Sequence, residues 1–176
     1  FPIHNYMTSL TSGEYRAGDN KLDLRGITRD SADNYFISTS VQGDSLKFAA
    51  TKAYYSVSDR KIEIDGVPAI YVADALITPE YAEVEIEQNG LIKELENATI
   101  EMNQETKYHR IYDATVQIIS GSEYEGTGKY DYIKVKGKDQ YINFEQIQVN
   151  GSKITTASGE LTAAQEFYLT DRIFFR

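Results

Sequence analysis

Carboxylates are the side chains of this sequence whose spacing most readily suggests chemistry. Glu83, Glu85 and Glu87 occupy alternate positions, so in a β-strand they would share one face at about 6.7 Å per two-residue step. Glycoside hydrolysis needs two carboxyl groups about 5–10 Å apart across a cleft, and a Ca²⁺ or carbohydrate site could use similar spacing. A solvated strand face carries the same pattern, so we assign no catalytic, cofactor-binding or metal-binding residue. A second acidic neighbourhood, with the same two interpretations, comprises Asp113, Glu123, Glu125 and Asp131.

Other catalytic residue types are scarce. The chain has no cysteine and two histidines, His4 and His109. A Ser-His-Asp triad would have to use one of them, and neither has a second histidine at metal-ligand spacing. For His109 we predict a solvated position at a strand end. The stretch Gly126-x-Gly128-Lys129 lacks the spacing of a phosphate-binding loop, and we interpret it as a tight turn before a strand. We therefore expect a protein that is not an enzyme and has no cofactor.

The charge balance disfavours a nucleic-acid partner, and the distribution of apolar residues disfavours a transmembrane segment. The net charge is −9, with 18 Lys and Arg against 27 Asp and Glu. A nucleic-acid binder needs a basic patch, and the densest basic stretch, Lys129–Lys138, is diluted by Asp131 and Asp139. No segment approaches the roughly 18 consecutive apolar residues that a membrane-spanning helix needs. We expect neither a nucleic-acid partner nor a transmembrane segment.

Period-two alternation predicts the elements that would position these groups. Lys21–Ile27, Lys61–Val67 and Tyr81–Glu87 alternate between polar and apolar residues, which is typical of half-buried strands. No window has a convincing helical stripe, so residues 1–176 are predicted to be a single all-β domain or repeat segment. Further strands are predicted at Asn34–Val41, Ser45–Tyr55, Ala69–Ile77, Leu91–Met102, Arg110–Ile119, Tyr130–Val135, Gln140–Val149 and Glu166–Phe175.

One six-residue pattern recurs along the chain. Val72–Ile77, Leu95–Ile100 and Ile111–Val116 share an apolar residue, any residue, Asp or Asn, Ala, any residue, and then a branched apolar residue. If short strands stack as rungs, the small Ala fits where backbones approach closely, and Asp or Asn tolerates the bend beside it. The recurrence favours a β-solenoid or an open stacked β-sheet. The alternative is a β-sandwich or jelly roll, whose alternating strands can give such matches by chance.

Residues 50–102 resemble one known family. The strand Ala50-Thr51-Lys52-Ala53-Tyr54-Tyr55, followed by Arg60–Val67 and Ala73–Ile77, is similar to an OstA-type repeat of lipopolysaccharide transport. In that family an Ala-x-x-Ala-Tyr strand leads through a turn to a strand that ends in Gly-Val. The resemblance implies a folded, open β-solenoid with an apolar groove for acyl chains. It covers less than a third of the chain.

The two ends of the chain suggest a part of a larger protein. Phe1 is not an initiator Met, and Phe167–Arg176 is an apolar run without a polar cap. We expect the terminal strands to contact flanking repeats or a second copy. Asp30-Ser31-Ala32 and Asp44-Ser45-Leu46 resemble an O-glycosylation signal of Gram-negative envelope proteins. They favour a periplasmic or extracellular location at the cell envelope.

Three functions remain open. The first is a non-catalytic structural or binding module of a larger exported bacterial envelope protein. The second is an OstA-like bridge that binds and transports lipid, and the third is a carbohydrate-active β-helix, so lipid and glycan are the candidate ligands. A filled interior would favour the first function, an apolar groove the second, and a cleft with convergent carboxylates the third.

Overall fold

The structure is a computed structural model. It describes residues 1, 4–26, 33–102, 109–131 and 141–159, and the backbone of 167–170 and 173–175. The described residues form antiparallel strands and no α-helix, which confirms the all-β prediction. The strands are β1 (Tyr6–Thr8), β2 (Ser12–Arg16), β3 (Lys21–Arg25), β4 (Tyr35–Ser38), β5 (Lys47–Ala49), β6 (Lys52–Ser56), β7 (Lys61–Asp65), β8 (Ile70–Val72), β9 (Ala75–Thr78), β10 (Glu83–Ile86), β11 (Leu95–Met102), β12 (His109–Ser120), β13 (Glu123–Asp131), β14 (Tyr141–Val149), β15 (Thr155–Ser158), β16 (Phe167–Thr170) and β17 (Ile173–Phe175).

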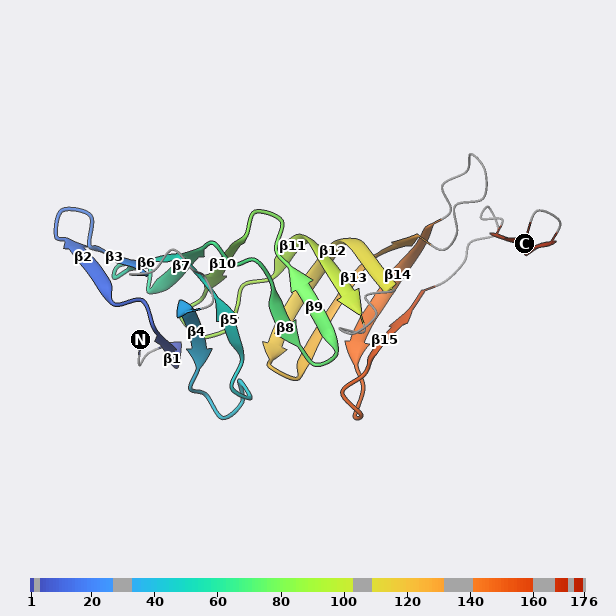
Figure 1. Cartoon of the computed structure of the whole chain (residues 1–176), viewed down its shortest axis with the longest axis horizontal. Helices are drawn as coiled ribbons and strands as arrows, with labels where there is room; N and C mark the ends of the chain where they lie inside the picture. Colours follow the sequence, from blue (N-terminus) through green and yellow to red (C-terminus); the bar gives the residue numbers. More distant parts are fainter. Residues whose placement is uncertain are drawn as a thin grey trace.

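Two open sheets make up the body of the molecule (Figure 1). The large sheet has ten strands in the order β1-β4-β5-β8-β9-β11-β12-β13-β14-β15, and the small sheet has five in the order β10-β7-β6-β3-β2. Successive strand pairs alternate between them: β2–β3 and β6–β7 belong to the small sheet, β4–β5 and β8–β9 to the large one. From β11 onwards the chain stays in the large sheet and meanders through neighbouring strands. Neither sheet closes on itself.

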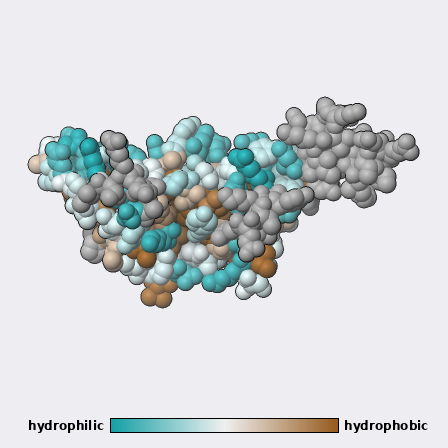
Figure 2. All heavy atoms as spheres, in the orientation of Figure 1, coloured by the Kyte–Doolittle hydropathy of each residue, from teal (hydrophilic) through white to brown (hydrophobic). Residues whose placement is uncertain are grey.

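One apolar core joins the inner faces of both sheets. In β7, Ile62 and Ile64 are buried, whereas the alternating Lys61, Glu63 and Asp65 are partly exposed. Full burial of each such Ile side chain contributes about 1.5–3 kcal/mol. In the view of Figure 2 the outer surface is mostly hydrophilic, and apolar residues show at its centre and at a few points along the lower edge.

The predicted strand Ser45–Tyr55 is in fact two strands in different sheets. β5 ends at Ala49 in the large sheet, and β6 begins at Lys52 in the small one. At the crossing the Thr51 N–H donates to the Asp65 carbonyl at 3.0 Å, and the Thr51 carbonyl accepts from the Gly26 N–H at 3.2 Å. The buried positions step from Ala50 to Ala53, so the alternation slips by one residue where the chain changes sheets.

The recurring six-residue pattern forms bulges in two of its three copies. Register shifts in the pairing of β11 with β12 fall beside Asn97 and Asp113, which have positive φ values of 51° and 46°. Ala98 and Ala114 follow them, are fully buried, and pair directly with each other. A bulge bends its strand and raises the local twist. The structure therefore places Asn or Asp at the bend and Ala at the close approach, as the pattern predicts.

The first copy of the pattern forms a hairpin instead. Val72 pairs with Ala75, and Ala73 and Asp74 make the turn between β8 and β9. The predicted strand Ala69–Ile77 is therefore two strands. Ala75 is fully buried like the other two Ala residues, but it pairs with Met102. It therefore lies outside the row that Ala98 and Ala114 form, and the pattern does not mark a uniform rung.

The predicted tight turn at Gly126-x-Gly128-Lys129 is wrong, because both glycines lie inside β13. A Cβ on Gly126 would overlap the carbonyl oxygen of Thr115, and one on Gly128 would lie 2.5 Å from Ile111 Cγ2. The bulged strand β12 thus approaches β13 too closely for larger residues. Glycine here serves close backbone approach rather than a turn.

The C-terminal strands β16 and β17 pair with each other as a separate two-stranded sheet. The predicted strand Glu166–Phe175 is therefore two strands rather than one. The predicted strand Tyr130–Val135 is described only to Asp131, where β13 ends, and its residues 132–135 lie outside the described residues. Within the described part of the chain, no helix has the length and apolar character needed to cross a membrane.

Candidate functional site

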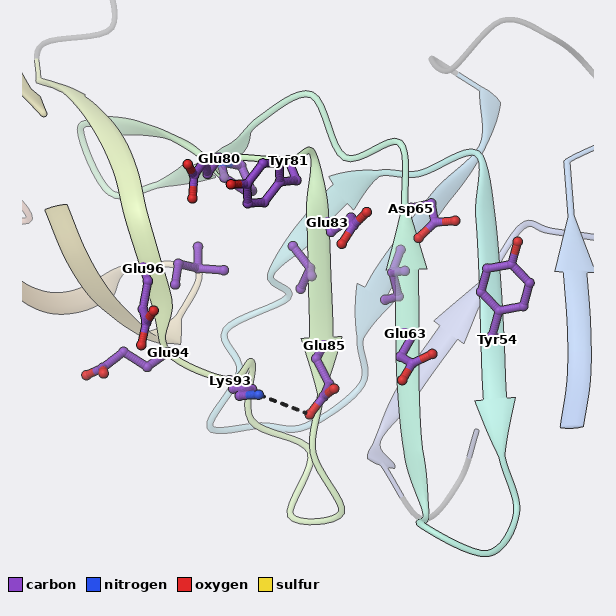
Figure 3. Close-up of a pocket in the computed structure, with 14 residues that line it drawn as sticks. Tyr54, Glu63, Asp65, Glu80, Tyr81, Glu83, Glu85, Lys93, Glu94 and Glu96 are labelled. Carbon is purple, nitrogen blue, oxygen red and sulfur yellow. Dashed lines mark ion pairs between the residues drawn. The ribbon is translucent and has the colours of Figure 1, made fainter. Parts of the chain in front are cut away.

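An acidic groove of about 520 Å³ lies beside the outer face of β10 (Figure 3). Strands β7 and β10 form one side, with Tyr54 of β6 beyond them, and the start of β11 forms the other. Tyr81, from the turn between β9 and β10, lies at one end. The carboxylates that line the groove are Glu63, Asp65, Glu80, Glu83, Glu85, Glu94 and Glu96.

Strand pairing brings four of these carboxylates together. β10 runs antiparallel to β7, so Glu83 lies opposite Asp65 and Glu85 lies opposite Glu63. The intervening Val84 is buried, which directs its neighbours to the outer face because side chains alternate along a strand. Like charges placed directly opposite each other destabilise an antiparallel pair. The arrangement therefore needs cations nearby.

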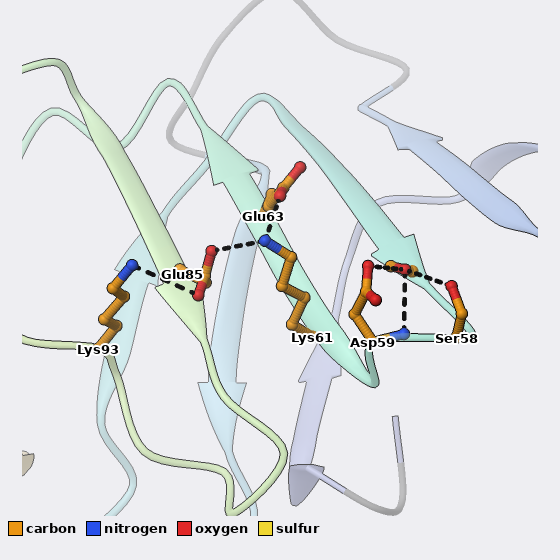
Figure 4. A network of polar contacts seen from close by, with 7 residues as sticks. Ser58, Asp59, Lys61, Glu63, Glu85 and Lys93 are labelled. Atoms are coloured by element: carbon orange, nitrogen blue, oxygen red, sulfur yellow. Dashed lines mark hydrogen bonds and ion pairs between the residues drawn. The ribbon is translucent and has the colours of Figure 1, made fainter. Parts of the chain in front are cut away.

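Two lysines supply part of this compensation (Figure 4). Lys61 Nζ lies 2.7 Å from Glu63 Oε1 and 3.0 Å from Glu85 Oε2. Lys93 Nζ lies 3.8 Å from Glu85 Oε1. The hydrogen bonds to Glu63 and Glu85 raise the pKa of Lys61 above its usual value. Lys61 therefore stays charged and holds the outer faces of β7 and β10 together.

The groove keeps an excess of negative charge. Among the described residues, no ion pair is made by Asp65, Glu83, Glu94 or Glu96. Charges of one sign lining a concave surface focus the field and raise the local concentration of counter-ions. The groove is thus suited to attract positively charged groups.

The end of the groove near Tyr81 is fixed by Asn97, which lies at the bulge in β11. Asn97 Nδ2 donates to Glu80 Oε2 at 3.1 Å, so the bend in β11 is tied to the turn before β10. A hydrogen bond to Glu80 also raises the pKa of Tyr81. Glu80 is therefore occupied by two donors, and its position is fixed relative to both walls.

The groove is not arranged as a metal centre. The part of the chain that the structure describes contains no group of three His, Asp or Glu side chains that could hold a metal ion. Its carboxylates spread along the walls rather than around one point (Figure 3). Their spread along the walls suits electrostatic attraction of positively charged groups.

The first acidic pattern of the sequence is only partly assembled here. Glu83 and Glu85 share the outer face of β10, as predicted, but Glu87 lies beyond the strand and lines another surface pocket, with Asp59 and Lys61. Sequence reasoning missed the carboxylates that face Glu83 and Glu85. A signal existed at Glu63 and Asp65, which alternate with buried Ile. The pairing of β7 with β10 was not readable, because β8 and β9 intervene in the sequence.

The second acidic neighbourhood does not form one site. Asp113 Oδ2 accepts from Lys129 Nζ at 3.0 Å, and Asp131 Oδ1 accepts from Tyr112 Oη at 2.8 Å. Desolvation and this bond to Asp131 raise the pKa of Tyr112 to about 12. Asp131 and Glu125 line different surface pockets. The group is a set of separate surface contacts on β12 and β13.

The two histidines lie in different environments. His4 is buried, and its Nε2 lies 2.7 Å from the Arg60 carbonyl oxygen, while its ring meets Tyr55 edge-on. His109 begins β12, is exposed, and has Nδ1 2.9 Å from Tyr130 Oη. The predicted solvated strand-end position of His109 is confirmed. His4 has the contacts of a core residue.

Comparison with known proteins gives no family. Models of protein families, curated proteins and solved structures were each compared with the chain, and none matched.

Proposed function

We propose that this chain is a non-catalytic structural or binding module of a larger exported bacterial envelope protein. The observation that carries the proposal is the alternation of strand pairs between two open sheets around one core. An open sheet grows by adding neighbouring strands, so such a stack can be lengthened by further pairs with the same inward pattern. Within this proposal the alternating pairs are rungs of a β-solenoid.

The packing of the interior supports a scaffold. The side chains of Phe36, Ile70, Ile100 and Ile147 come from strands spread across the large sheet, and all are less than 2% exposed. A close-packed core transmits strain and resists deformation. Ligand binding would then fall to the outer surface, where the acidic groove favours a positively charged partner.

An OstA-like lipid bridge is the second candidate. Residues 50–102 extend from the crossing before β6 to the end of β11, and this stretch includes strand pairs that alternate between the sheets. Acyl chains would need room between the sheets, which requires the packed inner side chains to separate. The third candidate, a carbohydrate-active β-helix, is favoured by the carboxylates that gather in the groove.

Two measurements on the full chain distinguish these functions. For a structural or binding module we expect no turnover on a panel of polysaccharides and esters, and no saturable binding of a fluorescent C16 fatty acid. Saturable one-to-one acyl binding would favour the lipid bridge. Turnover that disappears in Glu83→Gln, Asp113→Asn or Glu125→Gln would show an enzyme, and the position of the effective substitution would locate its site.

A further inference from the structure

Four hairpin turns of the large sheet lie along its lower edge in Figure 1, and hydrogen bonds and an ion pair join them into what we call the turn ring. The Gly43 carbonyl accepts from the Gly121 N–H at 3.0 Å, and the Gly121 carbonyl accepts from the Ala73 N–H at 3.0 Å. These bonds join the β4–β5, β12–β13 and β8–β9 turns. The β14–β15 turn joins them through Lys153 Nζ, 3.7 Å from Asp44 Oδ2. Turns that are several strands apart in the sheet therefore touch, because the large sheet is strongly curled.

Asp74 completes the turn ring by contacting the last strand of the large sheet. Its Oδ1 accepts from the Thr155 N–H at 3.0 Å and from Thr155 Oγ1 at 2.5 Å. The single hydroxyl proton of Thr155 is thereby used, so Tyr124 Oη donates to Thr155 Oγ1 across 2.7 Å. Tyr124 is only 1% exposed. A relay of three side chains thus fixes the start of β15.

The Thr155 N–H belongs to the free edge of β15. In the large sheet β15 pairs with β14 alone, and the Asn150 N–H donates to the Ile154 carbonyl across the hairpin. In an antiparallel ladder, alternate residues direct their backbone groups to the partner strand. The backbone groups of Thr155 and Ala157 therefore point away from β14, and Asp74 occupies the first donor on this edge.

The two edges of the small sheet are protected by different means. The free edge of the small sheet at β2 carries Glu14 and Arg16, and charged side chains discourage strand addition. Beside β10, the Lys93 N–H donates to the Glu85 carbonyl at 2.8 Å, so residues 91–93 cover that edge. The four residues of β15 include no charge and no proline. Two identical uncharged edges can pair antiparallel about a two-fold axis.

We propose that Asp74 is an edge cap that keeps β15 from pairing with β15 of a second copy of this chain. A carboxylate at the first edge donor offers acceptor atoms only, so it satisfies the Thr155 N–H and leaves no room for a second strand there. Without this carboxylate, the N–H and carbonyl groups of Thr155 and Ala157 form a self-complementary edge. Asp74 then determines whether the module is monomeric.

Sedimentation equilibrium of the full chain tests this role with two substitutions. Asp74→Ala removes the cap, and we expect self-association at least about tenfold tighter than in the unaltered chain. Asp74→Asn keeps an oxygen that can accept from Thr155, so it should sediment like the unaltered chain. Equal sedimentation of Asp74→Ala and the unaltered chain would contradict the proposal.

A second substitution identifies the surface that associates. Ala157→Pro removes an N–H that points to the free edge and leaves the hydrogen bonds to β14 intact. Combined with Asp74→Ala, it should return the chain to the monomer. Association that persists in the double variant would place the contact elsewhere and overturn the proposal.

Hydrogen exchange of the unaltered chain provides a test that does not depend on the folding of a variant. The Thr155 amide, held by Asp74, should exchange at least about tenfold more slowly than the Ala157 amide on the same edge, because exchange requires the hydrogen bond to open. Equal exchange at the two positions would show that Asp74 does not cap the strand.

Discussion

Ala98 of β11 lies directly opposite Ala114 of β12, and both side chains are fully buried where their strands bulge. Gly128 of β13 continues this row, because a Cβ built on it would lie 3.2 Å from the Cβ of Ala114. The three residues together have only two side-chain carbons. The bulged backbones thus approach closely enough that the row admits only the smallest residues.

Enlarging this row should destabilise the fold. Ala98→Leu inserts three carbons into a packed corner, and we expect a loss of about 1–3 kcal/mol in the free energy of unfolding. Thr127→Leu is the matched control, because Thr127 is exposed on the neighbouring strand β13; it should change stability by less than about 0.5 kcal/mol. Denaturant titrations of both variants measure the difference. An unchanged midpoint for Ala98→Leu would contradict the close approach.

The two glycines of β13 should be intolerant of even one methyl group. In Gly126→Ala the new carbon would overlap a backbone oxygen of β12, which cannot move without disturbing the bulge. We expect a cost of about 1–3 kcal/mol. In the β14–β15 turn, Gly151→Ala meets no atom within 4 Å and should stay within about 0.5 kcal/mol of the unaltered chain. Thermal unfolding that ranks the two substitutions equally would show that β13 does not need glycine.

Lys61 should stabilise the small sheet in a manner that depends on salt. Its ammonium lies between Glu63 and Glu85, so Lys61→Met leaves two carboxylates facing each other across β7 and β10. The group is partly exposed, and we expect a loss of at most about 1 kcal/mol, which should shrink in 1 M salt because screening weakens the repulsion. Lys52→Met on β6, where Lys52 is exposed, is the control. A loss that is independent of salt would assign the effect to packing instead.

Alkaline pH should unfold the chain in part through buried tyrosines. Burial raises the pKa of Tyr124 and of Tyr6 to about 12, against about 10 in the unfolded chain. Folding thus favours the protonated phenols, and their contribution to the free energy of unfolding is fully present below about pH 10. It is lost as the pH rises from about 10 to 12, at about 1.4 kcal/mol per pH unit for each group. Tyr124→Phe should flatten this slope, and an unchanged dependence of stability on pH would contradict the assignment.

The sequence predicts those strands well that have one buried and one solvated face. Ile62 and Ile64 of β7, and Val84 and Ile86 of β10, alternate with charged residues, and the structure buries all four. Alternation fails at β13, where glycine stands at the inward positions and suggests a turn. It also misses β1, β2 and β15, because their sequences Tyr-Met-Thr, Ser-Gly-Glu-Tyr-Arg and Thr-Thr-Ala-Ser do not alternate between apolar and polar residues.

The groove could be predicted only in part, because it depends on topology. Glu83 and Glu85 are readable as one face of a strand. Their opposition to Asp65 and Glu63 requires β10 to return to the small sheet after two strands in the large one. The contribution of Glu96 requires in addition that β11 form the opposite wall of the groove. The return of β10 leaves no local trace in the residues concerned, whereas Asn97 and Ala98 at the bulge belong to the recurring six-residue pattern.

The turn ring has a consequence for the order in which the chain acquires its structure. The hairpins β2–β3, β6–β7 and β8–β9 join residues close in sequence, so they can form as soon as their own strands are present. The contact of Asp74 with Thr155 spans 81 residues, and closing so long a loop carries the larger entropic cost. The contacts that fix the curvature of the large sheet can therefore form only after nearly the whole chain has been synthesised. Until β15 is present, a polypeptide that emerges N-terminus first would contain formed hairpins in a sheet whose curvature is not yet fixed.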